Sequence, residues 1–225
     1  MICSKSVCIF SNLALINHFL VENCGMRKSS SSNYIIDGRP VQEIGEQPWM
    51  VHIRNNLLNG SCGGSIINKN HILTAAHCIK VNGVVQPASA FTVHVGSIVR
   101  IAMKQDTFTV EKATYNSVFS KGLHDIAVLK LSKAIDFKKY KGNALPICLP
   151  AKEERGEEYT GQQGTVSGWG KTMRNQVIPT MFLQTASMKI LSGEQCKKHY
   201  PFIRVSHLCG GPWSRGEYTC GGDSG

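Results

Sequence analysis

The sequence has no C-x-x-C pair, although nine of its 225 residues are cysteine. Structural zinc sites usually take their ligands from cysteines paired at such short spacings. The His77-Cys78 pair comes closest to a ligand cluster, but it has no partner at metal-binding spacing. We therefore expect no metal and no cofactor, and we interpret the cysteines as the disulfide framework of a secreted protein.

The sequence also lacks an apolar run long enough to span a membrane. The apolar N-terminal region, residues 7–21, is interrupted by four polar residues: Ser11, Asn12, Asn17 and His18. This is a weak signal-peptide pattern without a clean A-x-A cleavage site. We expect residues 1–34 to be a signal peptide and prosegment, and we expect no membrane span.

Acidic residues are few, 15 against 25 lysines and arginines, and the net charge is +10. A basic surface attracts nucleic acid, heparin-like polyanions or acidic membranes. Because no nucleic-acid recognition motif accompanies the charge, we expect no nucleic-acid partner. We interpret basic runs such as residues 138–141 as solvated loops.

Internal repeats and long helical patterns are absent as well. From residue 35 onward, short apolar runs recur between turn residues, at 49–51, 65–67, 91–95, 108–110, 126–129 and 165–167. This pattern predicts antiparallel strands in sandwiches or barrels. Short helical turns are expected only at 74–79 and 193–200. The charged residues 151–161 are expected to be a surface connection between two halves.

Three stretches hold side chains that can do chemistry together. His77 follows small residues, Asp125 precedes an apolar run, and Ser224 lies among glycines. A serine hydroxyl becomes a nucleophile when a histidine base lies within hydrogen-bond reach and a carboxylate fixes the histidine tautomer. Glycines near Ser224 allow backbone N–H groups to hold an oxyanion. The chain order His, Asp, Ser argues against an α/β-hydrolase, in which Asp and His follow Ser.

In combination these stretches resemble the trypsin-like family of chymotrypsin-fold serine peptidases. The resemblance runs from about Ile35 to Gly225 and depends on eight segments in order: 35–38, 48–49, 62–67, 73–78, 125–131, 146–150, 168–170 and 222–225. It implies an all-β fold of two antiparallel six-stranded β-barrels with the active site between them. Residues 35–150 would form the first barrel and residues 151–225 the second. Relatives continue past the Gly-Asp-Ser-Gly motif, so we expect an incomplete second barrel and an inactive fragment.

The resemblance implies a role for each residue of the set. His77 would be general base and then general acid, Asp125 would orient it, and Ser224 would attack the scissile carbonyl. The backbone N–H groups of Gly222 and Ser224 would form the oxyanion hole. Polypeptides are the implied substrates, and protein inhibitors are further expected partners.

The family is made as a zymogen, and the resemblance gives Ile35 and Asp223 the roles of its activation ion pair. Cleavage would free the ammonium group of Ile35, which would pair with Asp223. Tyr34 precedes Ile35, where the family usually has Arg or Lys. Either an activating protease with chymotrypsin-like specificity cuts there, or activation does not happen.

Tyr218 and Thr219 correspond to the primary specificity pocket of the family. Trypsin-like members carry an aspartate at its floor, where this sequence has Tyr218. A phenol supplies no full negative charge at neutral pH, because its reference pKa is near 10. We therefore predict that Arg/Lys specificity is lost and that a small or medium apolar side chain is preferred.

Disulfides and a glycan are also expected. The resemblance implies the pairs Cys62–Cys78, Cys196–Cys209 and Cys24–Cys148, the last tethering the prosegment after cleavage. Separately, Asn59-Gly60-Ser61 is a glycosylation sequon beside Cys62. A glycan there would lie by the leaving-group side of the cleft.

The sequence thus predicts a secreted serine endopeptidase that hydrolyses peptide bonds through an acyl-enzyme. One alternative is a catalytically silent homologue that binds or regulates, which Tyr34 and Tyr218 favour. Another is a polyanion-binding module, which predicts retention on heparin that survives mutation of Ser224. Both alternatives are compatible with the same fold.

Overall fold

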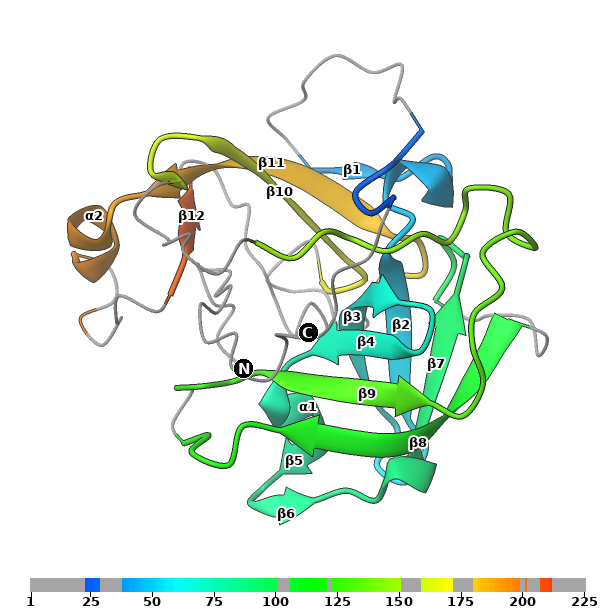
Figure 1. The fold of residues 1–225 in the computed structure, drawn as a ribbon. Coiled ribbons are helices and arrows are strands. Elements are labelled where there is room, and N and C mark those ends of the chain that lie inside the picture. The colour runs from blue at the N-terminus through cyan, green and yellow to red at the C-terminus, as the bar shows by residue number, and fades with distance from the viewer. Residues whose placement is uncertain are drawn as a thin grey trace.

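Figure 1 shows the chain as a computed structural model. The structure describes residues 23–28, 38–100, 106–120, 123–150, 159–171, 180–198, 201 and 207–211. These residues are mostly antiparallel strands, with short α-helices at α1 (Ala76–Ile79) and α2 (Gly193–Lys197). The all-β prediction is confirmed, and both helices lie where short helical turns were expected. Within the described part of the chain, no helix has the length and apolarity needed to cross a membrane.

Six antiparallel strands close into a barrel. They are β2 (Met50–Asn55), β3 (Gly60–Asn68), β4 (His71–Thr74), β7 (Phe91–Val95), β8 (Thr107–Tyr115) and β9 (Ala127–Leu131). Their order around the barrel is β2-β3-β4-β9-β8-β7. A short hairpin of β5 (Lys80–Val81) and β6 (Val84–Val85) follows α1 and pairs only with itself among the described strands.

The barrel interior is filled by the inward-facing residues of these strands. In β7 the side chains of Phe91, Val93 and Val95 are buried, and the residues between them are less so. This alternation is the period-2 pattern of a strand with one face on the core. Gly64 in β3 lies so close to its neighbours that an added Cβ would be 2.8 Å from Ile53 and 2.9 Å from Ile72. Only glycine fits there without moving the core.

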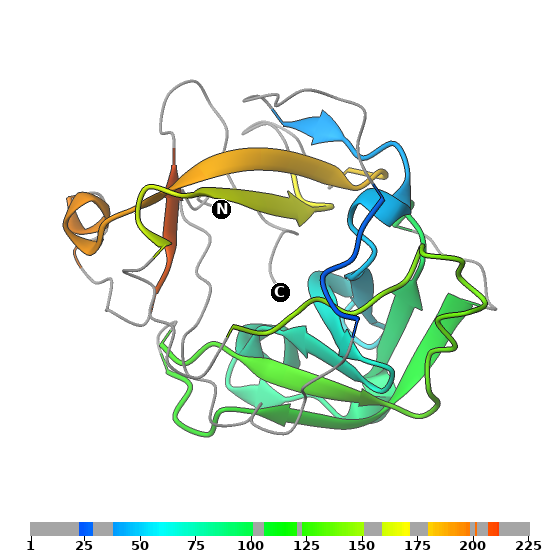
Figure 2. The same cartoon turned by 45° about the horizontal axis from the view of Figure 1, so that its top comes forward.

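A second antiparallel sheet lies beside the barrel (Figure 2). Its strands are β1 (Arg39–Pro40), β10 (Gln163–Gly168), β11 (Gln184–Leu191) and β12 (Cys209–Gly211), and β11 pairs with all the others. β1 comes from the N-terminal part of the chain but pairs with β11, so the two halves are connected through the sheet. The division into residues 35–150 and 151–225 stays a prediction.

Trp169 anchors a small apolar cluster between barrel and sheet, with Val41, Ile44, Met50 and Leu183. The Trp169 indole Nε1 donates a hydrogen bond to the Ile98 carbonyl at 2.8 Å. Leu183 donates its backbone N–H to the same carbonyl, also at 2.8 Å. The Ile98 carbonyl therefore holds Trp169 and Leu183 by hydrogen bonds, in addition to the apolar packing of the cluster.

A pair of histidines lies in the same region. His52 of β2 and His94 of β7 are register partners, and their rings stack with centroids 5.6 Å apart. His52 is 6% exposed, its ring meets Trp169 edge-on, and neither ring nitrogen has a hydrogen-bond partner among the described residues. Burial lowers the pKa of His52 to about 3, with smaller contributions from His94, Arg100 and Arg54.

We predict that acid destabilises the fold through His52. The ordinary pKa of histidine is 6.5, and the folded value of His52 is about 3. Between these values the unfolded chain binds a proton that the folded chain does not, so stability present above pH 6.5 is lost as the pH falls. The contribution of His52 alone at pH 5 is a loss of about 2 kcal/mol relative to pH 7.5.

The free energy of unfolding of wild type and His52→Phe, measured with urea at both pH values, tests this. We expect the variant to lose about 2 kcal/mol less stability on acidification. At pH 7.5 it should be no less stable, because the ring nitrogens that it removes were unpaired and buried. An equal loss in both proteins would contradict the prediction.

Candidate active site

His77 is placed by a sharp change from strand to helix. β4 ends at Thr74, Ala75 is extended, and α1 begins at Ala76. Ala75 and Ala76 are both buried, so their small side chains allow the helix to start directly against the barrel. The backbone N–H of Cys78 donates to the Ala75 carbonyl at 3.2 Å and completes the turn. His77 is left with 43% of its side chain exposed.

Asp125 is brought next to His77 by the pairing of β4 with β9. Thr74, the last residue of β4, is the register partner of Ala127, the first residue of β9. Because the strands are antiparallel, the residues after Thr74 and those before Ala127 leave the barrel at the same edge. His124 has a left-handed backbone, with φ of 56°. Its carbonyl accepts from Ile126 at 2.9 Å, which tightens the turn around Asp125.

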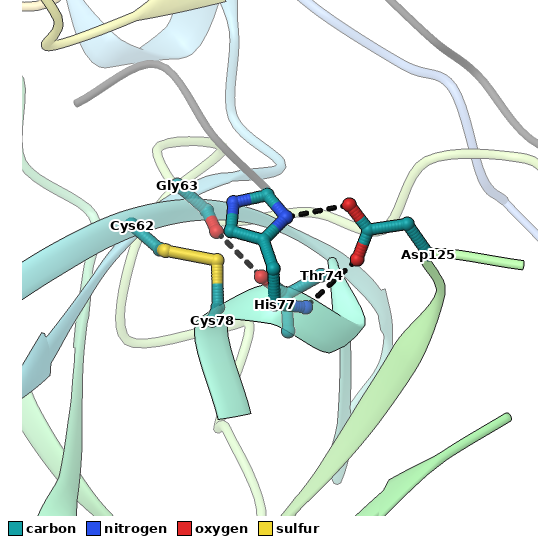
Figure 3. Close-up of a disulfide and its surroundings, with 6 residues drawn as sticks. All are labelled: Cys62, Gly63, Thr74, His77, Cys78 and Asp125. Carbon is teal, nitrogen blue, oxygen red and sulfur yellow. Dashed lines mark hydrogen bonds and ion pairs between the residues drawn. A yellow bond between two sulfur atoms is a disulfide. The ribbon is translucent and has the colours of Figure 1, made fainter. Parts of the chain in front are cut away.

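The Asp125 carboxylate contacts His77 through both of its oxygens, as Figure 3 shows. Oδ1 accepts from the backbone N–H of His77 at 2.7 Å. Oδ2 lies 2.5 Å from the ring Nδ1. The side chain of Asp125 is only 13% exposed, so this carboxylate is far better shielded from water than the imidazole that it holds.

This arrangement fixes which nitrogen of the neutral imidazole carries the hydrogen. An ionised carboxylate can only accept hydrogen bonds, so the hydrogen between the two side chains belongs to Nδ1. The neutral ring then carries its lone pair on Nε2, at the opposite side of the ring. The backbone bond to Oδ1 prevents the carboxylate from turning away. Nε2 is thus the nitrogen of His77 that is left able to accept a proton.

A disulfide and a buried hydroxyl support the same segment. Cys78, beside His77, is bonded to Cys62 of β3. Thr74 is buried and donates its Oγ1 hydrogen to the Gly63 carbonyl at 2.9 Å. Both contacts tie the strand-to-helix segment to β3. Thr74 lies within the motif of residues 73–78, but no sequence pattern marks its hydroxyl as a structural hydrogen-bond donor.

The sulfur atoms of Cys62 and Cys78 and a ring nitrogen of His77 lie within 4.8 Å of one another. A metal ion would need thiolate ligands, which the two cysteines cannot supply while they share a disulfide. The cluster is therefore better explained as a covalent brace for His77 than as a metal centre.

The structure contains the three disulfides that the resemblance implies: Cys24–Cys148, Cys62–Cys78 and Cys196–Cys209. It brings His77 and Asp125 together, and it places Asn59 at an exposed turn. The remaining predicted site residues lie outside the described part of the chain: Ile35, Tyr218, Thr219, Gly222, Asp223 and Ser224. Tyr34 and the expected signal peptide lie outside it too.

The chain is similar to known proteases. The family model described as Trypsin matches residues 35–225. Over 190 residues the chain is 35% identical to coagulation factor XI of Bos taurus, a match that covers 80% of this chain and 29% of that protein. Identity to the proclotting enzyme of Tachypleus tridentatus is 29% over 221 residues, covering 92% of this chain and 57% of that protein.

A third relative is the venom serine protease Bi-VSP of Bombus ignitus, 28% identical over 223 residues, or 90% of this chain and 58% of that protein. The chain therefore spans 29% to 58% of the length of these relatives. Among solved structures, the scabies mite inactivated protease paralogue S-D1 matches with a TM-score of 0.71 and 25% identity, covering 85% of this chain and 80% of that one.

The closed six-stranded barrel, the second antiparallel sheet and the pairing of His77 with Asp125 define a chymotrypsin-fold protein. The chain belongs to the trypsin family of serine proteases.

Removing the Cys62–Cys78 disulfide should destabilise the protein. The bond closes a loop between residues 16 apart in the sequence. The loss of this restraint on the unfolded chain predicts a drop of about 3 kcal/mol in the free energy of unfolding for Cys62→Ala/Cys78→Ala. Guanidinium unfolding of the variant and wild type measures the difference. A drop below about 1 kcal/mol would show that the disulfide adds little restraint.

Proposed function

We propose that this protein is a serine endopeptidase in which Asp125 and His77 activate Ser224. The hydrogen bonds between Asp125 and His77 are the observation that carries the proposal. A base held in one tautomer by a carboxylate that is largely shielded from water is what a serine nucleophile requires. The assignment of Ser224 as the nucleophile rests on the Gly-Asp-Ser-Gly motif and on membership of the family.

The reaction is acyl transfer. Ser224 Oγ attacks the peptide carbonyl while His77 Nε2 takes its proton, and the imidazolium that forms is stabilised by Asp125. His77 then gives the proton to the departing amine, and water releases the acyl group by the same steps. We assign the oxyanion hole to the backbone N–H groups of Gly222 and Ser224. Each such donor stabilises the transition state by about 3 kcal/mol.

We also propose that the protein is a zymogen activated by cleavage between Tyr34 and Ile35. Residues on both sides of this bond are anchored, which supports the proposal. On one side, the Cys24–Cys148 disulfide and a 2.8 Å hydrogen bond from Lys28 N–H to the Gly45 carbonyl hold the prosegment. On the other side, β1 pairs with β11, and the Arg39 guanidinium pairs with the buried Glu46 carboxylate. Asp223 would receive the new ammonium group.

Cleavage after Tyr34 requires an activating protease that accepts a large aromatic side chain. The disulfide to Cys148 would keep the prosegment attached afterwards, giving a two-chain enzyme. Disulfides persist in oxidising compartments, which supports secretion. Polypeptides are then the substrates, with protein inhibitors and polyanions as further partners.

A second candidate function is that of a catalytically silent homologue that binds or regulates. The similarity to a protease paralogue described as inactivated favours it. Tyr34 and Tyr218, which depart from the family pattern, favour it too. The two functions differ in one property, the reactivity of Ser224.

Labelling with a fluorophosphonate probe distinguishes the two. In full-length protein that has been cleaved before Ile35, we expect the probe to label Ser224. Asp125→Asn should slow labelling and peptide hydrolysis about 10³- to 10⁴-fold, because the amide no longer holds the required tautomer of His77. Asp136→Asn is a matched control, since Asp136 caps an exposed turn by accepting from Lys138 N–H. An unlabelled wild type would favour the silent homologue.

The specificity proposal depends on Tyr218. We expect the activated protein to cleave after small or medium apolar residues faster than after Arg or Lys. Tyr218→Asp should raise the ratio of kcat/KM for Arg over Leu substrates about tenfold or more, because it introduces a negative charge. Tyr218→Phe, which introduces none, should leave that ratio low. A wild type that prefers Arg substrates would contradict the assignment.

A further inference from the structure

The turn between β2 and β3 presents Asn59 to solvent. Residues 56–59 are all exposed, and Asn59 has a left-handed backbone with φ of 50°. Asparagine adopts this conformation more readily than most residues. Asn59, Gly60 and Ser61 form a sequon, and no other Asn-x-Ser or Asn-x-Thr occurs in the sequence.

The turn is held in shape by its own hydrogen bonds. The Asn55 side-chain carbonyl accepts from the N–H groups of Leu57 and Leu58, each at 3.1 Å. Asn56 donates its N–H to the Ala90 carbonyl at 2.8 Å, which ties the turn to the barrel. Asn59 is therefore the last residue of a turn held by hydrogen bonds, and it is exposed to a modifying enzyme.

Two large apolar side chains lie at the same turn. Leu57 is 63% exposed and Leu58 is 50% exposed, so the turn presents two adjacent apolar side chains to solvent. Among the described residues, neither belongs to a hydrophobic cluster. A group attached to the adjacent Asn59 would lie within reach of both.

The turn is joined to the candidate active site through β3. Asn59 is three residues from Cys62, a span of about 10 Å along β3. Cys62 is bonded to Cys78, the neighbour of His77. The disulfide and Asp125 lie on opposite sides of His77 (Figure 3). A bulky group on Asn59 would therefore approach His77 from the Cys62 end of the disulfide.

We propose that Asn59 carries an N-linked glycan that covers Leu57 and Leu58 and limits access of large polypeptides to the His77 side of the site. The sugar donor is a lipid-linked oligosaccharide diphosphate. The bond from the sugar's anomeric carbon to the diphosphate breaks, a bond to Asn59 Nδ2 forms, and Nδ2 loses a proton as the lipid diphosphate leaves. The effect on access rests on the proposed protease function; the modification itself does not.

Glycosidase treatment tests the modification. The chain is expressed in a eukaryotic secretory host. Protein is purified from cells and medium together, so that chains that are not secreted are also analysed. Treatment with peptide N-glycosidase should remove one glycan's mass and convert Asn59 to aspartate. Asn59→Gln and Ser61→Ala should lack that mass, whereas Ser61→Thr, which keeps the sequon, should retain it.

Asn116→Gln is the matched control, because Asn116-Ser117-Val118 is not a sequon and the glycan should stay. A wild type whose mass is unchanged by the glycosidase overturns the proposal. So does a mass loss that persists in Asn59→Gln.

Kinetics test the effect on access. In activated protein, removing the glycan by Asn59→Gln or Ser61→Ala should raise kcat/KM for a folded protein substrate about threefold or more, since a bulky group is lost. The value for a tripeptide amide should be unchanged, and Ser61→Thr should behave as wild type. Equal changes for both substrates overturn the access effect. Absence of activity in every variant refutes the protease function and leaves the mass result standing.

Discussion

The candidate site depends on the hydrogen bonds between Asp125 and His77. The strand pairing of the barrel brings the two residues into contact. The two residues are 48 positions apart in the sequence. They meet because β4 and β9 are neighbours. β4 ends at Thr74 and β9 begins at its register partner Ala127, both at the same edge of the barrel. A shift of that register by one residue would turn the buried residues of the shifted strand outward, so the packing of the core protects the alignment of the site.

The surroundings of His77 combine a rigid support with an accessible ring. The disulfide to Cys62 and the buried hydrogen bond from Thr74 hold the backbone of this segment. Asp125 is shielded while the imidazole is partly exposed, so the carboxylate lies in a less polar environment than the ring that it holds. This division suits a residue that must keep its orientation and still exchange protons.

The sequence predicted much of this fold, and the failures have physical causes. Apolar runs identified five of the six barrel strands as well as β10, because these strands bury one face. β4 was missed because it is short, and β11 because the polar residues Gln184, Thr185 and Ser187 hide the alternation. His77 and Asp125 were found through short motifs, because the order His, Asp, Ser along the chain distinguishes classes of serine hydrolase. The pairing of β1 with β11 and the buried stack of His52 on His94 are non-local contacts, which no local pattern in a single sequence reveals.

A crystal structure of the protein after cleavage before Ile35 tests the central claim most directly. The quantity to measure is the distance from Ser224 Oγ to His77 Nε2, with the Asp125 contact to Nδ1 intact. The account predicts a separation of about 3 Å, within hydrogen-bond reach. A serine held well beyond that reach, with His77 still bound to Asp125, would contradict it.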